Sequence, residues 1–287
     1  MRTTNAMQLK ALVRKRAQEE GVSPQLVMQN YLLEQLLERI SCSVWRDCII
    51  IKGGVLISSL VGVDKRSTQD LDTTVRGFAL THENAQKAFR EIAAVEVEDD
   101  FRFALVRTED VRETDDYPGI RVHLLANYEK MSVPVSVDVT TGDRITPEAI
   151  VYRYPLLFDR RSVSLMAYPL ATILAEKLET VISRSVVNTR PRDYYDLHTL
   201  WCMRKSEVVP EVLREALTAT AQRRNSLGAM SGWREVMEAV PADATMLHHW
   251  AAYVRRYPYV GEMRLQDACK TVVAMMEAIG WQAAARA

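Results

Sequence analysis

The sequence lacks several features that mark specialised protein classes. It has four cysteines, and none of them forms a CxxC pair, so neither a disulfide framework nor a structural zinc site is expected. No apolar run reaches the ~18 residues of a membrane-spanning helix, and the basic N-terminal segment contains no apolar stretch typical of a secretion signal. We therefore expect reduced cysteines and a cytoplasmic protein with no membrane partner.

An excess of charge is also missing. Lys plus Arg and Asp plus Glu number 37 each, which gives a net charge of zero. This balance argues against a strongly basic coat for nucleic acid, although a local basic patch remains compatible with it. Apolar residues make up 48% of the chain, as in ordinary globular proteins, and 287 residues can form two sub-domains with separate cores.

The most informative stretch extends from Cys48 to Asp72. Its apolar run Ile49–Ile51 leads into Lys52, Gly53 and Gly54, which are followed by an apolar segment and a polar turn. This order predicts a strand, a glycine turn, a helix and a second strand. A glycine turn lets the backbone approach a phosphate closely, and the N-terminus of the following helix offers N–H groups and a favourable dipole.

Two aspartates at the end of this stretch add a second element of a nucleotide site. Residues two apart on a strand point to the same face, so Asp70 and Asp72 are expected side by side, with Leu71 directed to the core. Two neighbouring carboxylates repel each other unless a cation lies between them, and ligation by oxygen alone favours Mg²⁺. The alternative is a solvated turn that ends in a capping aspartate.

A third carboxylate lies on a later predicted strand. Between Ser132 and Thr140, valines alternate strictly with Pro134, Ser136 and Asp138, so Asp138 is expected on a polar face. An isolated carboxylate on a central strand is costly to desolvate, and this makes Asp138 a candidate third metal ligand. On an edge strand it would simply face water.

The order of these segments predicts an α+β fold. Helices over residues 1–45 are expected to pack on a mixed, largely antiparallel sheet, since three strand candidates follow one another with short links. The predicted boundaries are 1–45 for the N-terminal helices, 46–150 for the sheet-containing core and 151–287 for a helical C-terminal domain. Residues 154–167 are expected to be irregular.

Two segments of the C-terminal half carry unusual charge. Residues 168–184 have the apolar periodicity of a helix, and Lys177 interrupts it beside Glu176 and Glu179. A lysine on a helix is usually solvated, so spacing alone assigns it no role. Residues 189–197 combine two arginines, two aspartates and two tyrosines, a denser polar cluster than helix capping requires.

Taken in order, the segments 52–54, 70–72, 138, 176–180 and 192–197 resemble those of nucleotidyltransferase toxins of the AbiEii and MenT type, within the DNA polymerase beta-like nucleotidyltransferases. The similarity covers about Ile49 to Trp201. It implies a Mg²⁺-dependent transfer of nucleotides from an NTP to RNA, with the 3′ end of tRNA as the leading acceptor. It also implies a cognate antitoxin as partner.

The same resemblance implies roles for individual residues. Asp70, Asp72, Lys177 and Asp196 would be catalytic, and Asp70 and Asp72, with Asp138, would ligate the metal. Lys177 would counter the phosphate charge. The other nucleotide-binding residues would be Lys52, Gly53, Gly54, Ser67, Arg192 and Asp193. Arg192 occupies a position where this family commonly has lysine, so the charge is kept while the geometry differs.

Other functions remain open at this point. A small-molecule acceptor, such as an aminoglycoside, or a protein acceptor would suit the same chemistry, and an acidic acceptor cleft would favour the small molecule. A nucleotide-binding module without catalysis, acting through protein contact, is the alternative from a different class. The intact set of Asp70, Asp72 and Lys177 counts against it, because a non-catalytic fold does not need that costly cluster.

Overall fold

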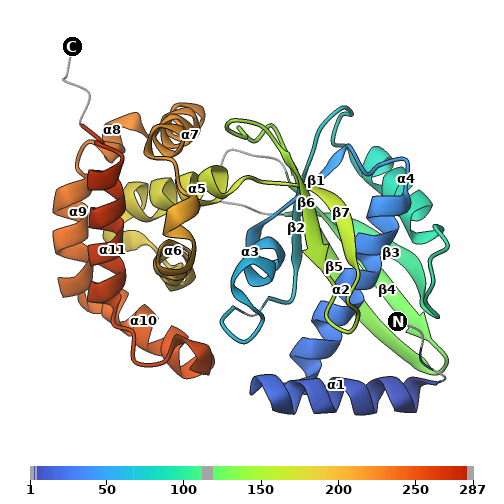
Figure 1. Ribbon diagram of the computed structural model, residues 1–287. Helices are drawn as coiled ribbons and strands as arrows, with labels where there is room; N and C mark the ends of the chain where they lie inside the picture. The colour runs from blue at the N-terminus through green and yellow to red at the C-terminus, as the bar shows by residue number, and fades with distance from the viewer. Residues whose placement is uncertain (1–2, 4, 67, 112–118, 283–287) are drawn as a thin grey trace. The chain divides into compact units, whose positions relative to one another are not determined.

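The computed structural model describes residues 3, 5–66, 68–111 and 119–282. The chain forms two compact units. The first comprises Met1–Asp143 and Ala149–Tyr168, and the second comprises Arg144–Glu148 and Pro169–Ala287. Figure 1 shows that the first unit contains the sheet and that the second is built from helices.

A seven-stranded mixed sheet forms the centre of the first unit, in the order β3-β4-β5-β2-β1-β7-β6. Two neighbouring pairs, β2 with β5 and β1 with β7, are parallel, and the other pairs are antiparallel. The predicted α+β class is confirmed. The strands are β1 (Ile49–Lys52), β2 (Leu71–Val75), β3 (Arg102–Val111), β4 (Gly119–Tyr128), β5 (Met131–Thr141), β6 (Ile150–Pro155) and β7 (Ser162–Ala167).

The β5 strand lies inside the sheet, between β4 and β2. Its valines Val135, Val137 and Val139 are buried, whereas Asp138 and its polar neighbours are partly exposed. The alternation seen in the sequence is therefore present in the fold, and the edge-strand alternative for Asp138 is wrong.

One stretch differs from expectation. Residues 154–167, expected to be irregular, contribute to the antiparallel pair β6 and β7, in which Tyr154 is opposite Val163. The edge strand β6 buries only Tyr154 and exposes Val151. Burial therefore shows little alternation along this strand.

The helices of the first unit are α1 (Ala6–Glu20), α2 (Pro24–Cys42), α3 (Gly53–Val61) and α4 (His82–Ala93). The Ser23 hydroxyl accepts a hydrogen bond from the Leu26 N–H, and Pro24 occupies the first turn of α2, where both residue types are favoured. Helices α2 and α4 contact each other and pack on the sheet, α2 on β5 and β7 and α4 on β3 and β4.

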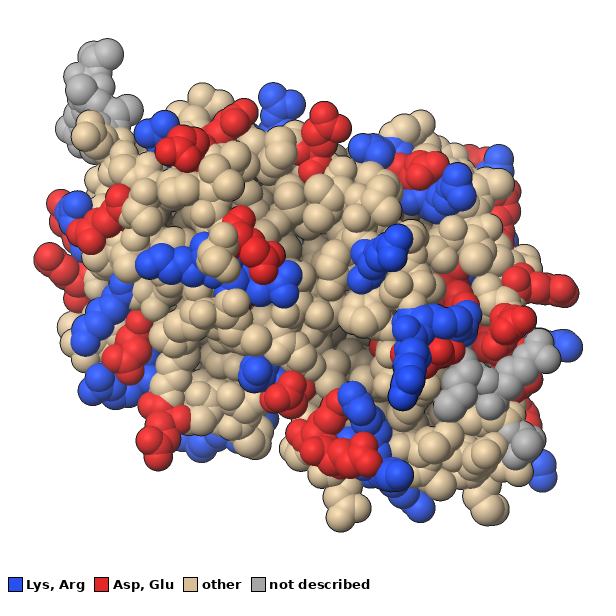
Figure 2. All heavy atoms as spheres, viewed as in Figure 1, with Lys and Arg blue, Asp and Glu red and all other residues tan. Residues whose placement is uncertain are grey.

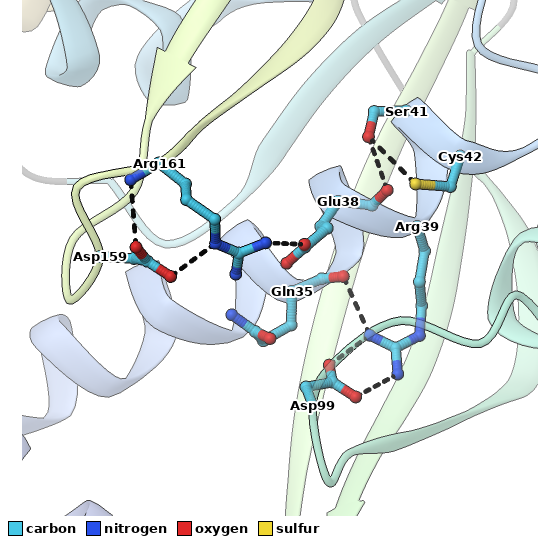
Figure 3. Close-up of polar contacts among 8 residues, drawn as sticks. All are labelled: Gln35, Glu38, Arg39, Ser41, Cys42, Asp99, Asp159 and Arg161. Carbon is cyan, nitrogen blue, oxygen red and sulfur yellow. Dashed lines mark hydrogen bonds and ion pairs between the residues drawn. The ribbon is translucent and has the colours of Figure 1, made fainter. Parts of the chain in front are cut away.

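Helix α2 is buried on most of its circumference and holds two loops through charged side chains (Figure 3). Arg39 donates to both carboxylate oxygens of Asp99, at 2.5 and 2.7 Å, and to the Phe101 carbonyl. The preceding residue, Glu38, accepts from Arg161 at 3.0 Å. Each buried charge therefore has an opposite charge beside it, as burial requires.

The second unit is helical throughout its described residues beyond Pro169. Its α-helices are α5 (Leu170–Ser183), α6 (Pro191–Arg204), α7 (Pro210–Arg223), α8 (Leu227–Met230), α9 (Trp233–Ala239), α10 (Ala244–Arg256) and α11 (Leu265–Ala278). Short 3₁₀ turns link several of them: η1 (Ser185–Val187), η2 (Lys205–Glu207), η3 (Val240–Ala242) and η4 (Pro258–Val260).

Basic and acidic side chains are interspersed on the face drawn in Figure 2, and neither sign forms a continuous coat there. This agrees with the net charge of zero. Among the residues that the structure describes, no helix is both long enough and apolar enough to cross a membrane.

The buried Glu34 on α2 makes the stability of the fold depend on pH. Both of its carboxylate oxygens accept from the Leu157 N–H, at 3.0 and 2.9 Å, yet burial raises its pKa from 4.5 to about 8. Between about pH 4.5 and pH 8, the folded protein therefore retains a proton on Glu34 that the unfolded chain loses. The stability that this proton supplies is complete below about pH 4.5 and is lost as the pH rises to about 8, by at most about 1.4 kcal/mol per pH unit.

We expect Glu34→Gln to remove this dependence, because the amide is neutral and keeps an oxygen for the Leu157 N–H. Urea titrations between about pH 5 and pH 8 should show the variant more stable than the wild type at the upper end, by at least about 1 kcal/mol. Glu98→Gln, at an exposed position, serves as the control. Parallel pH profiles for wild type and Glu34→Gln would contradict the assignment.

Candidate active site

The glycine turn between β1 and α3 is built around one close approach. Gly53 has φ 64°, and a Cβ added to it would lie 2.0 Å from Asp72 Oδ2. In the β1–β2 pair, Lys52 is directly opposite Asp72, so the chain must turn into α3 right beside this carboxylate. Only glycine combines the left-handed backbone with the absence of a side chain.

Asp72 is bound to the start of α3. Its Oδ2 accepts from the Gly54 N–H at 3.2 Å, which is a favourable place for a negative charge at a helix N-terminus. A Cβ on Gly54 would come within 2.5 Å of Thr68 Oγ1 and 3.3 Å of an Arg66 nitrogen. Arg66 and Thr68 are buried, and the sequence analysis assigned neither of them to the site.

The other two predicted acidic ligands lie just before β2 and on the neighbouring strand β5. Asp70 is exposed and precedes the strand, which begins at Leu71, so strand alternation does not fix its direction as expected. Asp138 is opposite Asp72 in the parallel β2–β5 pair. Both of its oxygens accept from Arg121, at 2.6 and 2.7 Å, and this bonding holds the pKa of Arg121 above its usual range.

Lys52 lies in a cluster that the sequence analysis did not identify. Its Nζ donates to Asp143 Oδ2 at 2.6 Å, and the same oxygen accepts from the Tyr168 hydroxyl at 2.6 Å and from Thr140 at 3.1 Å. Burial by itself raises the pKa of Asp143, but the charge of Lys52 and these hydrogen bonds outweigh it and lower that pKa. The one sequence signal was an aspartate that follows the end of β5 after a single glycine, Gly142.

The first unit offers carboxylates for a metal ion, but no complete cage. Within the described ranges, no group of three or more His, Cys, Asp or Glu residues is close enough to hold a metal. Mg²⁺ is commonly held by one or two carboxylates together with substrate phosphates, and Asp70 and Asp72 fit this pattern in their donor chemistry. Ser67, predicted to bind the nucleotide, lies outside the described residues.

The second unit brings together three predicted residues from two helices. Lys177 on α5 lies 2.5 Å from Asp193 Oδ1 and 2.8 Å from Asp196 Oδ2, both on α6. The two aspartates are buried, and the side chain of Lys177 is 13% exposed. A lysine of this kind is not a solvated helix residue, although the spacing of its helix suggested one.

Electrostatics favour the ionised form of Asp193. Burial raises its pKa, but the positive charges of Lys177 and Arg190 outweigh burial and bring the pKa well below the usual range. Arg190 Nε lies 3.0 Å from its second oxygen. Arg192 is exposed at the start of α6 and adds to this positive field.

Comparison with known proteins gives a family match over most of the chain. A model of the nucleotidyl transferase AbiEii toxin family, type IV toxin–antitoxin system, matches residues 35–274. No curated protein matches the chain significantly.

Two solved structures from Helicobacter pylori share the fold. One, described as a candidate nucleotidyltransferase, has 14% identity and a TM-score of 0.54, with 90% of this chain and 96% of the other covered. The second, JHP933, has 13% identity and a TM-score of 0.52, with coverage of 90% and 92%. At these identities the likeness concerns the fold alone.

The triad of Lys177, Asp193 and Asp196 yields a stability prediction. Lys177→Met should destabilise the protein by about 3–5 kcal/mol, because it removes the cation that pairs with both buried carboxylates and leaves Asp193 with Arg190 alone. Adding Asp193→Asn and Asp196→Asn to Lys177→Met should recover much of this loss. Urea unfolding followed by tryptophan fluorescence suits the test, since four of the five tryptophans lie beyond residue 200.

Lys270→Met, at an exposed position on α11, is the matched control and should unfold as the wild type does. If Lys177→Met unfolded at the wild-type urea concentration, the two carboxylates would not depend on this lysine.

Proposed function

The chain belongs to the AbiEii family of nucleotidyl transferase toxins of type IV toxin–antitoxin systems, and from this we propose that it transfers nucleotides from an NTP to RNA. Membership in the family implies an NTP substrate and a cognate antitoxin. As acceptor we propose the 3′ end of tRNA, where an added nucleotide would block translation. The RNA acceptor and its identity follow from the family resemblance of the sequence.

The observation that best supports the proposal is the arrangement of Asp72 at the glycine turn. A nucleotide triphosphate needs close backbone approach, N–H donors and a metal ligand at one place. Gly53 and Gly54 keep the space free of side chains, α3 directs its N-terminus to the turn, and Asp72 lies against it.

In this proposal Asp70 and Asp72 hold Mg²⁺. When bound, Mg²⁺ would lower the pKa of the attacking hydroxyl and neutralise the charge that develops on pyrophosphate. Asp138 is the proposed third ligand. Arg121 binds both of its oxygens with one hydrogen bond each, so a metal would have to share Asp138 with this arginine by using a remaining lone pair.

The protein's own residues would bind and orient the substrate. The Gly54 region would receive the triphosphate, and Lys52, together with Ser67 and Arg192, would contribute to nucleotide binding. Lys177 would counter the phosphate charge, while Asp196 and Asp193 would fix the direction of its ammonium group. The reaction would form a bond between the acceptor oxygen and the α-phosphorus, and pyrophosphate would leave.

We expect Asp70→Asn and Asp72→Asn to lower kcat by at least about 10²-fold, the scale of losing one electrostatic stabiliser. Asparagine at position 72 keeps an oxygen for the Gly54 N–H, so the turn should persist. The measurement incubates the full chain with Mg²⁺, each α-labelled NTP in turn and total RNA, and resolves the RNA on a denaturing gel.

Asp100→Ala, at an exposed position of the same unit, should label RNA at the wild-type rate. Near-wild-type turnover in folded Asp72→Asn would refute the metal assignment. Label in no RNA band would refute the RNA acceptor, and labelled protein or labelled small molecules would then identify the acceptor class.

A further inference from the structure

Four tyrosines of the second unit form a continuous cluster of rings. Tyr253 lies near all the others, with centroid distances of 6.1 Å to Tyr195, 5.0 Å to Tyr257 and 6.4 Å to Tyr259. Tyr259 also contacts Tyr195 at 5.2 Å and Tyr257 at 5.4 Å. We call these four residues the tyrosine cluster.

The cluster has a buried base and a partly exposed rim. Tyr195 and Tyr253 are buried, at 5% and 6% exposure. Tyr257 and Tyr259 flank Pro258 at the η4 turn and are each partly exposed. The hydroxyls of Tyr253 and Tyr259 are 3.1 Å apart. Packing accounts for the buried pair, but it does not require two large aromatic rings at the surface.

Arginines lie beside the rim. Arg255 and Arg256 end α10 and are exposed, and the Arg256 guanidinium lies 5.4 Å from the centre of the Tyr257 ring. The other charges nearby in sequence are Glu262, which is exposed, and Arg264, which is paired with Asp267. The rim therefore combines aromatic faces with a local excess of positive charge. Two arginines at a helix C-terminus also complement its dipole, so the arginines alone would indicate nothing.

The position of the cluster connects it to the proposed chemistry. Tyr195 lies between Asp193 and Asp196 on α6, whose carboxylates face Lys177. The same turn of helix therefore carries the carboxylates on one side and the base of the tyrosine cluster on another. A strand held on the cluster would be close to the Lys177 triad within a single unit.

We propose that the tyrosine cluster binds single-stranded RNA, with bases stacked on Tyr257 and Tyr259 and phosphates held by Arg255 and Arg256. Aromatic rings beside arginines are features that hold unpaired bases and their phosphates. Two rings can stack two bases and two arginines can bind two phosphates, so the surface suits successive nucleotides of a strand better than a single mononucleotide. The inference rests on the proposed function, since it gives the acceptor a binding surface.

The test measures binding of a fluorescein-labelled single-stranded RNA of about 12 nucleotides to the full chain without NTP. We expect Tyr257→Leu, which keeps apolar bulk but has no aromatic face, to weaken the Kd by at least about fivefold. Tyr257→Phe should bind within about twofold of the wild type. Urea unfolding of each variant reports whether the fold is intact.

A second pair of variants tests the phosphate contacts. Arg256→Gln should weaken binding and reduce the dependence of the Kd on salt concentration, because fewer counterions are released. Arg214→Gln removes an exposed arginine from α7 and should change neither quantity.

The outcomes separate this inference from the proposed function. If the wild type transfers label to RNA while folded Tyr257→Leu binds RNA with the wild-type Kd, the inference is wrong and the proposed function stands. If Tyr257→Leu raises the KM for NTP and leaves the RNA Kd unchanged, the ring binds the NTP base and the inference is also wrong. If the wild type neither binds nor labels RNA, both fail.

Discussion

The contact between Asp72 and the glycine turn is the constraint on which the first unit depends. Antiparallel pairing sets Lys52 opposite Asp72, and the chain enters α3 without an intervening loop. The carboxylate then occupies the space that a side chain on Gly53 would need. Backbone conformation, strand register and the position of a charge are thus fixed together, and a change in any one of them displaces the other two.

Several of the charged residues in the candidate sites are paired with an opposite charge. Lys52 pairs with Asp143, Arg121 with Asp138, and Lys177 with two aspartates. In the proposed reaction, an incoming phosphate would therefore compete at each of these cations with a carboxylate that is already bonded to it. Lys177 retains an advantage in this competition, because an ammonium group has three donors and two are directed at Asp193 and Asp196.

Local patterns in the sequence predicted much of the first unit, and pairing between distant segments supplied the rest. Alternation predicted the buried valines of β5 and the polar face that carries Asp138. It could not indicate that Arg121, on the neighbouring strand β4, would bind that carboxylate, because strand register is set by the whole sheet. The contact of Tyr168 with Asp143 likewise joins segments far apart in the sequence, which follow β7 and β5, so no local pattern could indicate it. The strands β6 and β7 were both missed. The edge strand β6 buries only Tyr154, but β7 lies inside the sheet and buries Val163, Leu165 and Ala167 in alternation.

The sequence of α6 shows how a short helical segment serves several purposes at once. Successive residues on a helix are rotated by about 100°, so Asp193 and Asp196 share one side while the tyrosines between them point elsewhere. Tyr194 is fully buried and donates to the Val181 carbonyl at 3.3 Å, which ties α6 to the helix that carries Lys177. Tyr195 instead meets the rings near η4. One turn of helix therefore carries residues of the charged triad, of the packing against α5 and of the tyrosine cluster.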